Sequence, residues 1–277
     1  MEENEGNNMA EGSRDSQADG EKMMKSWFSD NLISIIIVLA LFWLIKKIVF
    51  GTQRRWFSYV MHLCTKDEFV QLEEVKKDHF ASLSTIVSQD PQLRKQKVIK
   101  ILEIGVGTGV NFPHYPDGSH LVVVDPNPHF QSYFDANRKK FPNIHSEGII
   151  VTTGDKMEMI SDNSVDVVVM TLVLCSVDNI DEVLREILRV LAPGGKYYFM
   201  EHIAEFDLKK HWLRRKLQDA FSWLWSFIFD GCRLNCDVLP NIQRAGFSSV
   251  DAQKYYAPVP SVIFDLERPN LKGIAVK

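Results

Sequence analysis

The sequence predicts an α/β fold, in which a seven-stranded, mostly parallel sheet carries helices on both faces. The first observation is that short apolar, β-branched runs alternate with helical patterns over residues 98–202, which is typical of right-handed βαβ units. The second is a glycine-rich turn directly after the first of these runs. The third is a pair of strand patterns near the end, at about 249–256 and 271–276, which adds a terminal hairpin to the sheet.

Residues 1–25 predict a disordered acidic tail. The stretch is rich in Glu, Asn, Gly, Ser and Asp and contains no aromatic or β-branched residue, so it cannot bury enough apolar surface to offset the entropy of ordering. It does not resemble a secretory signal, because the residues before the following apolar run are acidic rather than basic.

Residues 26–50 predict a hydrophobic, membrane-anchoring helix. The run Leu32–Ile45 has 14 residues, all of them apolar except Ser34, whereas a bilayer span needs about 20 apolar residues. The longer stretch Trp27–Phe50 has 24 residues and is long enough if Lys46 and Lys47 extend to the interface. The sequence leaves open whether this helix spans the bilayer or lies in one leaflet. The acidic residues before it and the basic residues after it place its C-terminal side in the cytosol.

Composition limits the remaining choices. The net charge of −4 is concentrated in residues 1–31, which hold eight acidic and three basic side chains, so no basic patch points to nucleic acid. Four cysteines among 277 residues do not form a disulfide framework, and they fit a reducing, cytosol-facing location. Cys232 and Cys236 are four residues apart, but no neighbouring Cys or His completes a metal set, so we expect no metal.

The elements follow in order after the hydrophobic segment. Residues 51–97 have apolar residues at helical spacing and predict a helical cap or linker, which covers the ligand or simply packs against the sheet. The domain 98–277 comes next, and its clearest helix is 179–191, which Asp178 or Asn179 can cap and which Pro193-Gly194-Gly195 ends. The other expected elements are strands 98–105, 120–125, 148–153, 165–173 and 196–202, and helices from about Val110 and over 127–140.

The glycine-rich turn is the strongest chemical signal. Its pattern is Glu103-x-Gly105-x-Gly107-x-Gly109, and glycine lets a ligand lie directly against the backbone. The dinucleotide pattern Gly-x-Gly-x-x-Gly differs from it, and a carboxylate at Glu103 suits a ligand with an ammonium and a sulfonium group better than a pyrophosphate. Asp125 ends the second strand, where its carboxylate can accept hydrogen bonds from both ribose hydroxyls. This combination is typical of Rossmann-like class I methyltransferases that use S-adenosylmethionine.

Ligands of open parallel sheets bind beyond the carboxyl ends of the strands, so the other strand ends supply further candidates. A flat face for adenine follows Asp125, and Asp155 can accept a hydrogen bond from the adenine amine, although it also suits a plain turn. Backbone carbonyls after the fourth strand can take the ammonium group of the methionine portion. The predicted cofactor-binding residues are Glu103, Gly105, Gly107, Gly109, Asp125, Pro126, Asn127, Asp155, Lys156, Thr171 and Leu172.

Longer stretches resemble the methyltransferase-like protein 7 family. The resemblance covers roughly residues 27–277, and at Val106 and Asp155 the chain departs from the cysteine and the glutamate that are common in the family. It implies a membrane-anchored enzyme of the endoplasmic reticulum or lipid droplets, with S-adenosylmethionine as methyl donor and a small apolar thiol as acceptor, and with no obligate protein partner. The stretches that carry it are Ser164–Val177, Leu184–Gly195, Tyr198–His202, Phe229–Cys232, Glu267–Pro269 and Gly273–Lys277.

Thiol methylation needs little from a protein. Alkyl thiols lose their proton near the cysteine pKa of about 8.5, so proximity and alignment can supply most of the catalysis, with one base or polar group favouring the thiolate. The candidates for that group are His202, at the end of a strand, and Asp230, in Phe229–Cys232. The aromatic segment Trp212–Phe229 predicts a helix that lines the acceptor pocket, touches the membrane or packs in the core.

Two other functions stay open at this point. The stretch Arg189–Gly195 also resembles C- and O-methyltransferases that act on quinone- or lipid-like acceptors. The other hypothesis is a membrane or lipid-droplet adaptor that binds the cofactor but catalyses no reaction. The intact glycine and aspartate pattern argues against this hypothesis.

Overall fold

The computed structural model describes residues 3–67, 70–259 and 262–277. The chain divides into two units, residues 1–52 and 53–277, and each is described by itself.

Helix α1 (Glu3–Asp67) forms the whole described part of the first unit and continues into the second. Its backbone is helical over residues 3–25, where composition predicts disorder, whereas residues 1–2 lie outside the described part. Extending an existing helix costs far less than nucleating one, which gives a physical reason for this difference.

The apolar part of α1 meets the requirements for a membrane helix. Ser29–Thr65 is long and apolar enough to cross a bilayer, and none of its most apolar window is buried. Ile33, Val38 and Phe42 are 75%, 63% and 66% exposed. An apolar helical stretch whose side chains are exposed is suited to lipid, so this most apolar part of α1 can serve as a membrane anchor.

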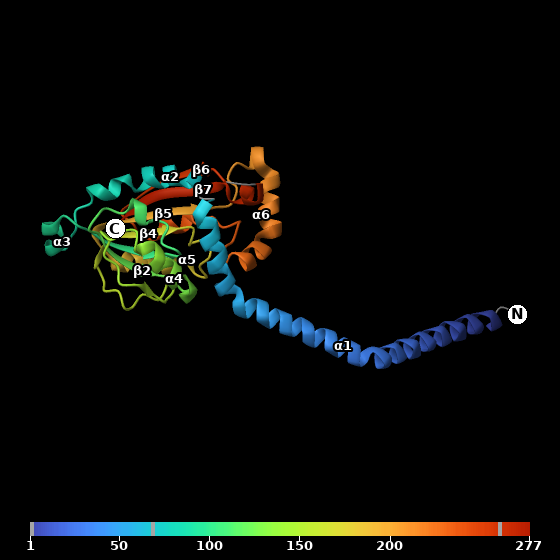
Figure 1. Ribbon diagram of the computed structural model, residues 1–277. Helices are drawn as coiled ribbons and strands as arrows, with labels where there is room; N and C mark the ends of the chain where they lie inside the picture. Colours follow the sequence, from blue (N-terminus) through green and yellow to red (C-terminus); the bar gives the residue numbers. More distant parts are fainter. Residues whose placement is uncertain (1–2, 68–69, 260–261) are drawn as a thin grey trace. The chain divides into compact units, whose positions relative to one another are not determined.

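The second unit contains the predicted seven-stranded sheet, with strand order β3-β2-β1-β4-β5-β7-β6 (Figure 1). β7 runs antiparallel to both of its neighbours, and the other pairings are parallel. From β1 the chain first adds β2 and β3 on one side, and it then adds β4 and β5 on the other side. Such a switch point creates a ligand crevice at the carboxyl ends of β1 and β4. The strands are β1 (Lys100–Ile104), β2 (His120–Val124), β3 (Ile149–Ile150), β4 (Val165–Thr171), β5 (Leu191–His202), β6 (Ser249–Tyr256) and β7 (Pro269–Val276).

Helices cover both faces of this sheet. One core cluster packs Val183 and Ile187 of α5 and Ile242 of α7 against the strands. The other cluster contains Phe80 of α2 and Phe134 of α4. These two clusters confirm the predicted layering. The helices are α2 (Val70–Phe80), α3 (Pro91–Gln96), α4 (Gln131–Arg138), α5 (Ile180–Val190), α6 (Leu208–Ile228) and α7 (Leu239–Arg244).

Three local predictions were wrong. The helix expected from Val110 is replaced by turns and by the short 3-10 helix Phe112–His114, because positive-φ glycines precede it and Pro113 lies within it. The helix expected over 127–140 is split into the 3-10 turn Pro128–Phe130 and α4. β3 keeps only two of the six residues expected for that strand.

The start of α5 yields a stability prediction. The Asn179 side chain accepts a hydrogen bond from the Glu182 N–H at 3.3 Å, so Asn179 is the N-cap. We expect Asn179→Ala to lower the free energy of unfolding by about 1 kcal/mol, measured by urea unfolding in detergent. Asp178→Ala, next to it and equally exposed, should change it by less than about 0.5 kcal/mol. Equal losses in the two variants would show that Asn179 is not the cap.

Candidate active site

A cavity of about 410 Å³ lies at the switch point of the sheet. Gly105–Thr108 of the glycine turn, Asp125 and Pro126 after β2, and the loop Thr171–Val173 after β4 form its sheet side. The end of α1 contributes Phe57 and Met61, and α2 contributes Lys76. Part of the predicted helical cap therefore covers this site.

The three glycines of the turn have different roles. All have positive φ, at 72° for Gly105, 52° for Gly107 and 77° for Gly109. A Cβ at Gly105 would collide with Val173, and one at Gly109 would collide with Phe112. A Cβ at Gly107 would meet no described atom closer than 3.9 Å, and it would instead fill part of the cavity. Gly107 is thus the position at which a ligand can lie against the backbone.

Asp125 lies directly beside this glycine at the edge of the cavity. Its side chain is 4% exposed, and its two carboxylate oxygens accept hydrogen bonds from the N–H groups of Gly107 (2.9 Å) and Asn127 (2.8 Å). Burial raises its pKa to about 6, and the two hydrogen bonds counteract part of that rise. Each oxygen keeps a lone pair for a further donor, so the carboxylate is oriented and able to accept from ribose hydroxyls.

Glu103 lies beneath the cavity instead of on its surface. Its oxygens accept hydrogen bonds from Asn111 Nδ2 (2.8 Å) and Tyr115 Oη (2.7 Å). Burial raises the pKa of Glu103 to about 7, which the hydrogen bonds from Tyr115 and Asn111 partly counteract. Asn111 also donates to Thr171 Oγ1 (3.0 Å). Through Asn111 the carboxylate therefore links the segment after β1 to the end of β4, and Glu103 supports the cavity from outside its lining.

The structure describes all the predicted site residues, and it brings about half of them together. Asn127 donates its side-chain amide to the Arg54 carbonyl and supports the Asp125 loop from outside the cavity. Asp155 and Lys156 lie in a turn beyond the short strand β3. The predicted residues that line the cavity are Gly105, Gly107, Asp125, Pro126, Thr171, Leu172 and Asp230; the others, Glu103, Gly109, Asn127, Asp155, Lys156 and His202, lie outside the lining.

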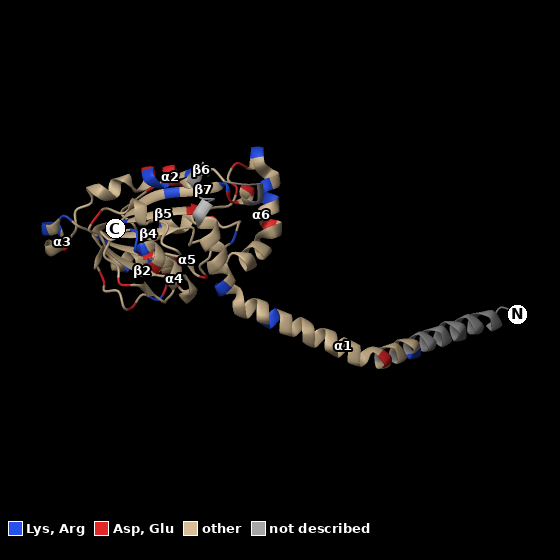
Figure 2. Cartoon of the chain, in the orientation of Figure 1, with Lys and Arg blue, Asp and Glu red and all other residues tan. Residues whose placement is uncertain are grey.

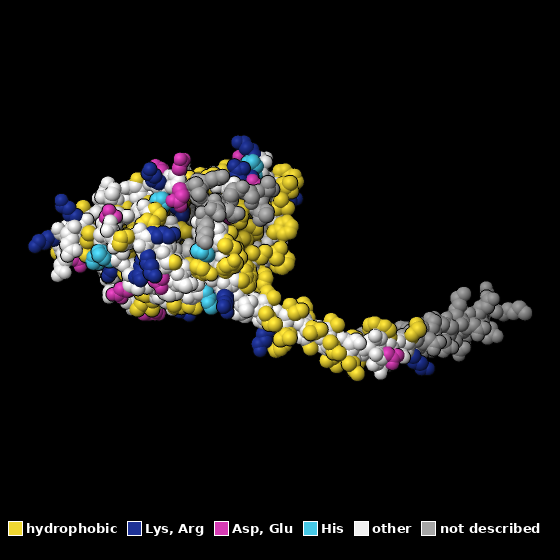
Figure 3. All heavy atoms as spheres, viewed as in Figure 1, with side chains coloured by type: hydrophobic (Ala, Val, Ile, Leu, Met, Phe, Trp, Pro, Cys, Tyr) yellow, Lys and Arg dark blue, Asp and Glu magenta, His cyan; other side chains and the backbone are white. Residues whose placement is uncertain are grey.

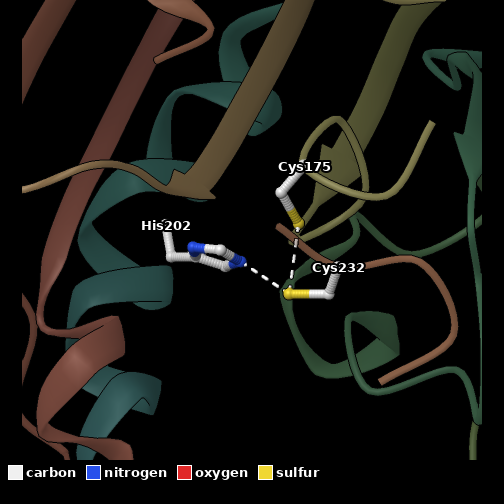
Figure 4. Close-up of side chains that lie close together, drawn as sticks. All are labelled: Cys175, His202 and Cys232. Carbon is white, nitrogen blue, oxygen red and sulfur yellow. Dashed lines mark hydrogen bonds between the residues drawn. The ribbon is translucent and has the colours of Figure 1, made fainter. Parts of the chain in front are cut away.

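His202 lies at the end of β5 and is 2% exposed. Its Nε2 atom is 2.8 Å from Cys232 Sγ, and Cys175 Sγ is 3.7 Å from the same sulfur (Figure 4). The expectation that no cysteine or histidine joins Cys232 was wrong. The two residues that contact Cys232 are 30 and 57 positions away in the chain, so they are not its neighbours in the sequence.

Two cavity residues have strained backbones. Leu172 has φ 59° and Asp230 has φ 44°, a left-handed conformation that costs a side-chain-bearing residue about 1–3 kcal/mol. Asp230 follows α6, and Leu172 follows β4, where its N–H donates to the Met200 carbonyl at 2.7 Å. Strain of this kind persists only where the surroundings enforce it, which favours a functional role for this side of the cavity.

Sequence reasoning missed the charged group on α2. Lys76 lines the cavity, is 7% exposed and lies 3.8 Å from Glu73. Burial lowers the pKa of Lys76, whereas Glu73 and Glu103 raise it. The helical spacing of 70–80 was the available signal for α2, but spacing does not reveal which face meets the ligand.

Comparisons with known proteins fit this geometry. Residues 102–199 match a family described as a methyltransferase domain. Human thiol S-methyltransferase TMT1A is 36% identical over 225 residues, which are 81% of this chain and 87% of that protein. Rat thiol S-methyltransferase TMT1B is 33% identical over the same shares of the two chains.

The chain belongs to the thiol S-methyltransferase family of TMT1A and TMT1B. It is therefore an S-adenosylmethionine-dependent methyltransferase, which confirms the resemblance seen in the sequence. UbiE of Shewanella frigidimarina, a ubiquinone/menaquinone biosynthesis C-methyltransferase, is 31% identical over 64% of each chain. The methyltransferase that binds the Trm112 activator in Haloferax volcanii has a TM-score of 0.51 at 15% identity, covering 78% of this chain and 96% of that one. This last likeness shows the fold.

The cavity fits the methyl donor of this family. The space left by the missing Cβ of Gly107 lies beside the oriented carboxylate of Asp125, as a nucleoside with two ribose hydroxyls requires.

We expect Asp125→Ala to weaken S-adenosylmethionine binding about ten- to hundredfold, measured by calorimetry, because each hydrogen bond to a charged group contributes about 1.5–3 kcal/mol.

The wild-type affinity should also fall about tenfold per pH unit below pH 6, since burial raises the Asp125 pKa to about 6 and only the ionised form offers both acceptors. Asp125→Asn should lack this dependence, and Asp178→Ala should bind like wild type. An unchanged affinity in Asp125→Ala would overturn the site.

Proposed function

We propose that this enzyme transfers the methyl group of S-adenosylmethionine to small alkyl thiols at a membrane surface. The observation that carries the proposal is the relationship to TMT1A and TMT1B over four-fifths of the chain. The cavity supports it, because the nucleoside side at Gly107 and Asp125 continues into an apolar side. That apolar side includes Phe57, Met61, Leu72, Met200 and Phe229.

S-adenosylmethionine supplies an electrophilic methyl group on a sulfonium. The protein then has to hold the nucleoside, exclude water and align the acceptor sulfur. Asp125 and the glycine turn hold the nucleoside, while the apolar side chains select an uncharged alkyl group and exclude water. A thiol near pKa 8.5 already contains a few per cent of thiolate at neutral pH, so alignment is the main requirement.

Asp230 is the acceptor-side group in this proposal. It lines the cavity beside Phe229 and Ser176, where its carboxylate can accept a hydrogen bond from the acceptor S–H and orient the sulfur. His202 was the other candidate, but it is buried behind the lining and bonded to Cys232. We therefore assign the acceptor contact to Asp230 and give His202 no contact with the acceptor.

A surface of α6 supports the membrane location. Trp212, Phe221 and Trp223 are 56%, 46% and 72% exposed, and Figure 3 shows hydrophobic side chains gathered over this helix. The same helix carries Lys209, Lys210, Arg215 and Lys216 (Figure 2). Exposed aromatic and basic residues on one helix are typical of helices that lie in a lipid interface.

Together with the apolar part of α1, this surface leads us to propose that α6 rests on the bilayer to which the chain is anchored. We place that bilayer at the endoplasmic reticulum or the lipid droplet, with the domain in the cytosol. The basic residues after the apolar run support this orientation. So do the four cysteines, all within the described residues, which form no disulfide there.

A side-by-side assay tests the reaction. With alkyl thiols and a quinol precursor offered separately, we expect methyl transfer to the thiols. Asp230→Asn should lower kcat/KM for them about tenfold, because the neutral amide accepts a weaker hydrogen bond than the carboxylate. Its affinity for S-adenosylmethionine should stay unchanged, and Asp117→Asn serves as an exposed control. Transfer to the quinol alone would favour a UbiE-like C-methyltransferase, and tight cofactor binding without any transfer would favour an adaptor.

The α6 surface yields a separate prediction. In full-length protein reconstituted into vesicles, Trp212→Ser/Trp223→Ser should raise KM several-fold for a long-chain thiol dissolved in the lipid and leave KM for a water-soluble thiol unchanged. Val87→Ser/Val151→Ser is the matched control, because these side chains are 64% and 56% exposed outside α6. A uniform change for both thiols would argue against contact of α6 with lipid.

A further inference from the structure

We propose that Cys175, His202 and Cys232 form a binding site for one zinc ion behind the acceptor side of the cavity. Cys175 lies in the loop after β4, His202 ends β5, and Cys232 follows α6. Their ligand atoms lie within 4.8 Å of one another. In Figure 4 the two sulfurs and the imidazole Nε2 converge from three different segments of the chain.

The separation of the two sulfurs fits a tetrahedral ion. Two sulfurs that each lie about 2.3 Å from zinc are about 3.8 Å apart, and the Cys175 and Cys232 sulfurs are 3.7 Å apart. The His202 Nε2 is 2.8 Å from Cys232 Sγ, where a shared ion requires about 3.5 Å. Zinc binding would therefore move the imidazole away from this sulfur.

His202 can present a zinc-binding nitrogen. The residue is 2% exposed, and its Nε2 faces the Cys232 sulfur. Its Nδ1 has no hydrogen-bond partner among the described residues. With the ring proton on Nδ1, the lone pair of Nε2 is free to coordinate the ion.

The donor types select the metal. Two cysteine sulfurs and one imidazole are ligands for zinc, while calcium and magnesium require oxygen donors. Two cysteines and one histidine also occur as a three-residue zinc set, in which the fourth position is left to water. Zinc binding releases the thiol protons, so the ligands are thiolates in the bound state.

The ion would fix the wall of the cavity. Ser176, next to Cys175, and Asp230, two residues before Cys232, both line it. Arg233 already joins the two loops, because its backbone N–H donates to the Cys175 carbonyl at 3.1 Å. A common ion would tie both loops to the end of β5 and maintain the strained conformations of Leu172 and Asp230. Only the description of this wall as the acceptor side of the cavity rests on the proposed function.

Metal content tests the proposal directly. Full-length protein from zinc-supplemented cells, purified in detergent with a non-chelating reductant, should contain one zinc per chain by elemental mass spectrometry. Cys175→Ser, Cys232→Ser and His202→Gln should each lose it, whereas Cys64→Ser and Cys236→Ser should retain it. Cobalt added to zinc-depleted wild-type protein should give a sulfur-to-metal charge-transfer band, and this measurement stays decisive if a variant fails to fold.

Three results would overturn the site: wild-type protein without zinc and without a cobalt band, zinc that persists in all three ligand variants, or a Cys175–Cys232 disulfide in the reduced preparation. Each readout is independent of methyl transfer. A protein without zinc that still methylates thiols would contradict the zinc site alone. A protein with zinc that methylates no thiol would contradict the proposed reaction alone.

Discussion

The site depends on a buried carboxylate that two backbone N–H groups hold in place. Asp125 ends β2, and its hydrogen bonds to Gly107 and Asn127 tie that end to the turn after β1. An ionised carboxylate at 4% exposure is unfavourable without such donors. The same bonds leave one face of each oxygen for a ligand. One interaction therefore positions the loop, stabilises the charge and orients the carboxylate that we propose as the acceptor for the nucleoside.

A second layer of polar groups supports the first from beneath. Glu103 accepts from Asn111 and Tyr115, and Asn111 reaches on to Thr171 at the end of β4. Burial raises the pKa of Glu103 to about 7 and lowers that of the neighbouring Lys76. Both shifts have the same cause, a polar network withdrawn from water, which strengthens each hydrogen bond and makes each missing one costly. These polar contacts therefore add to the backbone pairing and apolar packing that hold the ends of β1 and β4 together.

The features predicted correctly from sequence are those that depend on local patterns. The apolar runs predicted the strands, and the glycine spacing with Asp125 predicted residues that line one cavity, because strand ends in a parallel sheet necessarily meet at one edge. The helix expected from Val110 was wrong, since apolar spacing could not outweigh the glycines and Pro113. The meeting of Cys175, His202 and Cys232 had no local signal, because their proximity exists only after the chain has folded. The same holds for the position of Lys76 in the cavity.

Apolar surface has two separate uses in this chain, and both bear on the acceptor. Inside the second unit, Phe57, Met61 and Leu72 give the cavity an apolar side. On the surface of the same unit, Trp212 and Trp223 of α6 are exposed together with basic residues of that helix, and the proposed contact with lipid would remove their apolar surface from water. In the proposed reaction the acceptor is an apolar thiol, and a thiol of this kind also partitions into lipid. A chain anchored in the membrane would then meet its acceptor at the higher concentration found in lipid, without any new contact to the substrate.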